Sequence, residues 1–73
     1  MFGRSRNERA QRHADTAEGY ASMVNHDQDL TADERRVGSR VSATAARRAE
    51  RLSPGITSRR QLLREVEEFR SGR

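Results

Sequence analysis

The chain has 73 residues, a formal net charge of +4, fifteen arginines, no lysine and no cysteine. A chain of this length forms one small domain, so we treat residues 1–73 as a single unit with frayed ends at 1–4 and 71–73. The lack of cysteine excludes a disulfide or a thiolate metal site as a source of stability. Large apolar side chains are few, which indicates a marginal monomer that a partner or a homodimer would stabilise.

No run of consecutive apolar residues is longer than two, so the sequence predicts neither a membrane span nor a signal-peptide core. We expect a cytoplasmic protein of a bacterium, phage or plasmid, without contact to a membrane. The exclusive use of arginine has two interpretations. It reflects a GC-rich genome, or it provides guanidinium forks that suit phosphate and carboxylate groups.

The first predicted helix covers residues from about 5 to 24. Ser5 followed by Glu8 is a capping box, in which the hydroxyl and the carboxylate each accept a backbone N–H at the start of a helix. Small apolar residues then recur at intervals of four and three: Ala10, Ala14, Ala17, Ala21 and Val24. Alanine buries little area, so this helix needs a second helix at close approach. The polar residues 25–29 predict a loop.

The second predicted helix, from about 31 to 52, carries two faces of opposite character. Thr31 and Glu34 spell another capping box. One arc of the helix holds small and apolar residues: Val37, Gly38, Val41, Ser42, Ala45, Ala49 and Leu52. Another arc holds four arginines over a length of about 22 Å, namely Arg36, Arg40, Arg47 and Arg51. We call these four residues the arginine ridge.

Ser53, Pro54 and Gly55 predict a type II turn, with proline and glycine at its two central positions. A third helix is expected from about 58 to 70, begun by a box of Ser58 and Gln61 and ended by a glycine at position 72. Its apolar stripe consists of Leu62, Leu63, Val66 and Phe69. We interpret this stripe as core, with an interface to a second copy or a partner as the alternative.

Catalysis is not expected from this composition. His13 and His26 have no triad-type neighbours in the sequence, and the paired carboxylates lie in segments that look solvated. A chain this small and polar offers little room for the desolvated pocket that a tuned acid or base requires. His26, Asp27 and Asp29 have the residue types of a metal site, but their spacing matches no closed ligand set, and a loop between helices explains them equally well. No cofactor is predicted.

The arginine ridge has a plain and a functional interpretation. A run of charge on a helix is commonly just its solvated face. However, like charges four residues apart repel, and Arg36 with Arg40 and Arg47 with Arg51 are such pairs. Phosphates spaced along a nucleic-acid backbone would relieve that repulsion.

The start of the third helix offers a second candidate anion site. Arg59 and Arg60 lie in its first turn, where free N–H groups also attract anions. The turn and this helix partly resemble a helix-turn-helix motif, with base or phosphate contacts from Ser58, Arg59, Arg60, Gln61 and Arg64. The preceding helix and the turn are longer than in that motif, and three glutamates occupy the second half of the helix, so only its first half would approach nucleic acid.

The sequence thus predicts an all-α fold of three helices, with dimerisation as an option. We predict a small, basic, non-catalytic regulator that binds duplex DNA. The predicted contacts are Arg36, Arg40, Arg47, Arg51, Arg59, Arg60, Gln61 and Arg64. The alternative is a protein-interaction module, antitoxin-like or an adaptor, that binds an acidic protein through the same arginines.

Overall fold

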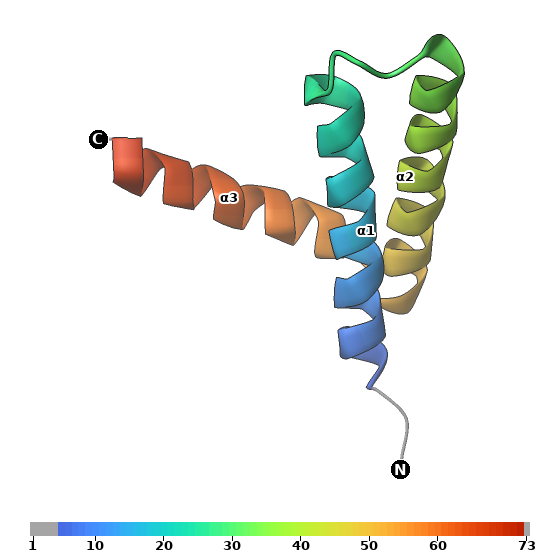
Figure 1. The fold of residues 1–73 in the computed structure, drawn as a ribbon. Coiled ribbons are helices and arrows are strands. Elements are labelled where there is room, and N and C mark those ends of the chain that lie inside the picture. Colours follow the sequence, from blue (N-terminus) through green and yellow to red (C-terminus); the bar gives the residue numbers. More distant parts are fainter. Residues whose placement is uncertain (1–4, 73) are drawn as a thin grey trace.

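A computed structural model describes residues 5–72, and within them the chain is all-α, as predicted. The three helices are α1 (Arg6–His26), α2 (Ala32–Leu52) and α3 (Ile56–Gly72). Helices α1 and α2 lie side by side as an antiparallel hairpin, and α3 projects sideways from it (Figure 1). The frayed ends predicted at 1–4 and 73 lie outside the described residues, whereas residues 71 and 72 belong to α3.

Both ends of the hairpin helices are capped by side chains. The two capping boxes predicted for α1 and α2 are confirmed, with Ser5 and Thr31 as the cap residues. At the other ends, arginines donate to the last carbonyl groups. Arg35 Nη1 donates to the Val24 carbonyl at 2.6 Å, and Arg6 Nε donates to the Leu52 carbonyl at 3.0 Å. Each helix of the hairpin therefore supplies a guanidinium that caps the C-terminal end of the other helix.

The contact between α1 and α2 consists mostly of small residues. Ala10, Ala14 and Ala17 of α1 are buried, as are Gly38, Ala45 and Ala49 of α2. A Cβ added at Gly38 would lie 2.7 Å from Val24 Cγ2, so glycine is what lets the helices approach at this point. Ser42 also donates to the Ala17 carbonyl of α1 at 2.7 Å. The alanine spacing of the sequence is thus the packing seam of the hairpin.

The largest fully buried side chain, Ile56, enters at the base of the hairpin. It packs with Ala10, Ala14 and Ala49, and Leu52 lies against this cluster. The preceding turn has the predicted type II character, because Gly55 has a φ of +87° and the Ile56 N–H donates to the Ser53 carbonyl. Helix α3 therefore begins at Ile56, two residues before the predicted start, because this side chain is the one that anchors it.

Two further predictions about α3 are wrong. Ser58 is not the cap residue, since it lies inside the helix, and Gly72 is helical rather than a terminator after it.

The interpretation of the apolar stripe of α3 as core is wrong as well. Leu62, Leu63 and Phe69 are 60%, 64% and 85% exposed, and Val66 is exposed as well. Beyond its first turns, α3 extends away from the two hairpin helices (Figure 1), which leaves this stripe exposed.

Candidate nucleic-acid interface

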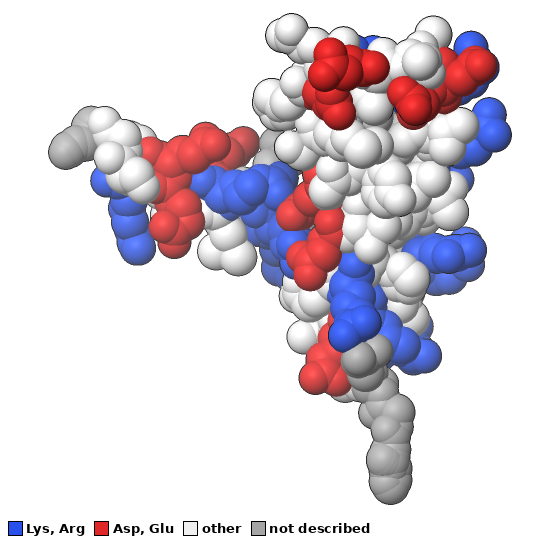
Figure 2. Space-filling model, in the orientation of Figure 1, with Lys and Arg blue, Asp and Glu red and all other residues white. Residues whose placement is uncertain are grey.

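The arginine ridge lies on the face of α2 that points away from α1. Its residues are centred about 180° around the helix axis from the buried Gly38, Ala45 and Ala49. All four arginines are exposed. In Figure 2, basic side chains project at intervals along the α2 side of the hairpin, while the acidic ones in view lie at its loop end, on its α1 side and on α3. The packing of the hairpin therefore fixes the ridge as an outer surface.

Most of the charge on the ridge is not neutralised by any acidic side chain within residues 5–72. Arg36 Nη1 lies 2.8 Å from Asp33 Oδ1, which is an exposed ion pair within the helix. In the described part of the chain, the Arg47 side chain has a single hydrogen bond, a long one of 3.4 Å to the Thr44 hydroxyl. Within residues 5–72, Arg40, Arg47 and Arg51 form no ion pair. Three positive charges on one rigid helix face thus remain available to an external anion.

Arg48 extends this positive surface, although it is not among the predicted contacts. Arg40 and Arg48 line a shallow hollow between the two hairpin helices, together with His13 and Thr16 of α1. Arg48 lies off the arc of the ridge, which is why a search for one arc missed it. Arg48 follows Arg40 by two steps of four residues, and this i, i+4, i+8 row is the sequence signal that indicates it.

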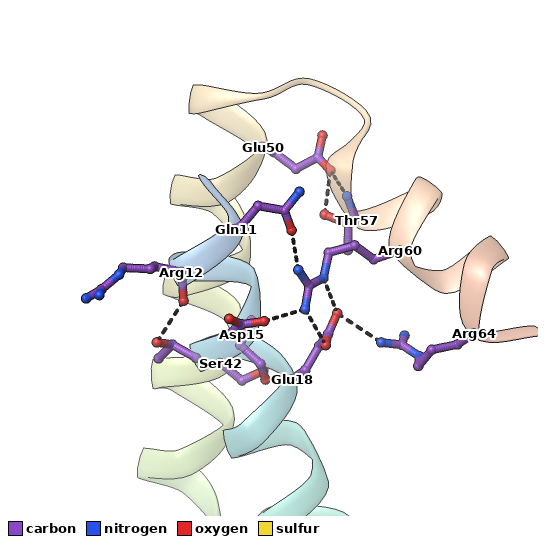
Figure 3. Close-up of polar contacts among 11 residues, drawn as sticks. Gln11, Arg12, Asp15, Glu18, Ser42, Glu50, Thr57, Arg60 and Arg64 are labelled. Atoms are coloured by element: carbon purple, nitrogen blue, oxygen red, sulfur yellow. Dashed lines mark hydrogen bonds and ion pairs between the residues drawn. The ribbon is translucent and has the colours of Figure 1, made fainter. Parts of the chain in front are cut away.

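Arg60 and Arg64, predicted to contact nucleic acid, instead join α3 to α1 (Figure 3). Arg60 Nε lies 2.8 Å from Glu18 Oε2, and Arg60 Nη2 lies 2.5 Å from Asp15 Oδ1. Arg60 also donates to the Gln11 side chain. Arg64 Nη1 lies 2.9 Å from the same Glu18 oxygen. The hydrogen bond from Arg60 lowers the pKa of Glu18, and Glu18 in turn raises the pKa of Arg60.

The predicted anion site at the start of α3 is already filled by a carboxylate of the chain. Glu50 of α2 accepts the Gly55 N–H at 2.9 Å and the Thr57 N–H at 2.8 Å, and it also accepts the Thr57 hydroxyl. These bonds, that of the hydroxyl first, lower the pKa of Glu50 to about 2. Glu50 thus replaces the predicted Ser58 as the cap of α3, from another helix.

Two more of the predicted contacts of α3, Arg59 and Gln61, are also engaged within the chain. Arg59 donates to the Pro54 carbonyl at 3.1 Å and to the Ser53 hydroxyl at 3.0 Å, which folds its guanidinium back over the turn. Gln61 donates to Glu65 one helical turn away at 3.3 Å. The first half of α3 is therefore occupied with holding the turn and the hairpin, and the arginine ridge is separate from it.

The loop residues considered as metal ligands have local structural partners. His26 Nδ1 lies 2.9 Å from the Ser22 carbonyl oxygen, and Asp27 accepts the Asp29 N–H at 2.9 Å in a short turn. Within residues 5–72, no group of three histidine or acidic side chains is placed to hold a metal ion. None of the helices in this range is both long and apolar enough to cross a membrane.

Comparisons of the chain with protein-family models, with curated proteins and with solved structures find no match.

Proposed function

We propose that this protein is a small non-catalytic, regulatory nucleic-acid-binding protein that grips the phosphates of duplex DNA with the outer face of α2. The observation that carries the proposal is the row of Arg40, Arg47 and Arg51, which are exposed and lack ion pairs within residues 5–72. A guanidinium presents a planar fork to phosphate oxygens, which suits a row of such groups to a nucleic-acid backbone.

The helix holds these charges at defined intervals. Arg40 and Arg51 are eleven residues apart, about 16 Å along the axis, and Arg47 lies between them. Arg48 adds a charge on one flank, above the hollow beside α1. Phosphate contacts position a protein on DNA but carry no sequence information. Since Arg60 and Arg64 are held by Glu18, the proposed binding has little capacity to read bases.

The proposal is tested by measuring duplex binding as a function of salt. Each phosphate neutralised contributes about −0.9 to the slope of log affinity against log salt concentration. Three or four contacts from the ridge therefore predict a slope of about −3, for duplexes of any sequence. The variant with both Arg40→Gln and Arg47→Gln should have a slope smaller by about two.

A matched control variant carries Arg9→Gln and Arg12→Gln, two exposed arginines of α1. It loses the same net charge but leaves the ridge intact, so its slope should equal that of the unmodified protein. If both variants lose affinity equally, the binding depends on net charge rather than on the ridge, and the proposal fails.

An acidic protein is the second candidate ligand of the same face. The observation favouring it is that four large apolar side chains of α3 are exposed, as in protein-interaction modules. It predicts no duplex binding by micromolar protein at about 50 mM salt, where phosphate contacts are strong. It also predicts that the two ridge substitutions abolish binding to the acidic protein.

A further inference from the structure

We propose that the exposed stripe of α3 binds the same stripe of a second copy, so that the two α3 helices pair in parallel as a short coiled coil. The seam of this homodimer consists of Leu62, Val66 and Phe69, with Leu63 at its edge. This inference does not depend on DNA binding, because none of these residues belongs to the arginine ridge.

The spacing of the stripe is that of a coiled-coil seam. Leu62, Val66 and Phe69 follow one another at intervals of four and three, as the a and d positions of a heptad do. Val66 takes an a position, and Leu62 and Phe69 take d positions. All three are among the exposed large apolar residues of the chain. Pairing would remove them from water.

The attachment of α3 leaves this seam accessible. Arg60 and Arg64, which bind Glu18 of α1, lie about 170° around the helix axis from the centre of the seam. The hairpin of each copy would therefore lie on the outside of the helix pair. Arg59 also falls on the line of the seam, but its guanidinium is folded back onto Pro54 and Ser53. It therefore adds no charge between the helices.

Charge complementarity favours a second copy in parallel orientation. Glu65 and Arg70 flank the seam on opposite sides, at g and e positions, and are five residues apart. In a parallel pair, Glu65 of one copy meets Arg70 of the partner subunit, and the symmetry makes this contact twice. In an antiparallel pair, Glu65 of one copy would instead face Glu65 of the partner subunit, and the two negative charges would repel each other. Within residues 5–72, neither Glu65 nor Arg70 forms an ion pair.

The expected dimer is weak, because the seam contains only three layers and an interface this small is typical of transient association. We expect a dissociation constant on the order of 10–100 μM, measured by sedimentation equilibrium. Val66→Asp should leave a monomer at all concentrations up to about 1 mM. Its circular dichroism should remain helical, because Val66 is exposed in the single copy and does not belong to the buried core. Glu68→Gln, on the far side of α3, should dimerise as the unmodified protein does.

The orientation is tested by cross-linking, since the chain has no cysteine of its own. In the parallel pair, Leu62→Cys lies next to its counterpart across the axis, so oxidation should join two copies of this variant rapidly. An antiparallel pair sets a positions opposite d positions, so it would instead join Leu62→Cys to Val66→Cys in a mixture and leave Leu62→Cys alone unlinked. That second pattern overturns the proposal.

Charge reversal tests the proposed ion pairs. Glu65→Arg alone or Arg70→Glu alone should weaken dimerisation roughly ten-fold, because each places like charges together twice. The protein with both substitutions should regain the original affinity. If the double variant is as weak as the single ones, or if the unmodified chain is monomeric at about 1 mM, the proposal is wrong.

Discussion

The hairpin and α3 are stabilised in opposite ways. In the hairpin, alanines, a glycine and a serine let two helices approach closely, and arginines from each helix close the end of the other. In α3, one isoleucine is buried and the other attachments are polar, while the larger apolar side chains remain exposed. Small residues thus form the seam of the hairpin, whereas the large apolar residues of α3 other than Ile56 are left on the surface.

The largest effect should come from removing the buried anchor of α3. Ile56→Ala should lower the free energy of unfolding by about 2–5 kcal/mol, because it empties the centre of the cluster at the base of the hairpin. In a domain of marginal stability this is enough to unfold much of the protein. Urea denaturation measures it. A loss below about 0.5 kcal/mol, the level of a neutral surface substitution, would contradict the anchor.

Removing the polar attachment should have the next largest effect. Arg60→Met keeps the apolar stem but leaves Glu18, Asp15 and Gln11 without their shared donor, at a cost of about 1–3 kcal/mol. The pKa of Glu18 should rise at the same time, since the Arg60 hydrogen bond is the main cause of its lowering. Carboxyl NMR titration detects this rise. An unchanged Glu18 pKa would show that the two groups do not interact.

Two glycine substitutions test how closely the hairpin helices approach each other. Gly19→Ala should stabilise the protein by about 0.5–1 kcal/mol, because alanine favours the helix and its Cβ meets nothing within 4 Å. Gly38→Ala has the same helical gain, but its Cβ would lie 2.7 Å from Val24 Cγ2, and overpacking costs about 1–3 kcal/mol. The melting temperature should therefore rise for Gly19→Ala and fall for Gly38→Ala. Two upward shifts would argue against close approach at Gly38.

The Glu50 cap predicts a smaller effect that depends on pH. Its pKa is about 2 in the folded chain and 4.5 ordinarily, so the unfolded chain binds more protons between these values. The stability from this cap is complete above pH 4.5 and declines as the pH falls toward 2. Glu50→Gln should be less stable at neutral pH and lose less stability on acidification. Glu68→Gln, an exposed control on α3, should lose as much stability on acidification as the unmodified protein does.

The parts of the fold that sequence predicts well are set by local interactions. The boxes of Ser5 and Thr31 need only residues within one turn, and the turn at Gly55 needs only its own backbone. The start of α3 could not be predicted in this way. It depends on Glu50 and on the cavity that Ile56 fills, and both belong to the packed hairpin. The strong stripe of α3 suggested core because periodicity does not reveal whether a second surface is present.

The candidate site divides along the same line. The ridge follows from helical spacing alone, so its four members could be named from sequence. The arginines that hold the fold together could not be named from sequence. Their partners are distant in the chain, at 46 residues for Arg6, 11 for Arg35 and 42 for Arg60. With arginine as the only basic residue type, sequence gives no means to separate such roles. Helical spacing therefore predicts DNA contacts for Arg60 and Arg64, although Glu18 binds both.

The central claim is that the apolar stripe of α3 is surface and not core. Its most direct test is the stability of Phe69→Ala, measured at a protein concentration well below that of dimerisation. Phe69 is 85% exposed, so the free energy of unfolding should change by less than about 0.5 kcal/mol. A phenylalanine packed in a core would cost about 3–5 kcal/mol on the same substitution. An unchanged denaturation curve is the result we predict, and a loss in the core range would show that the stripe of α3 folds onto its own hairpin.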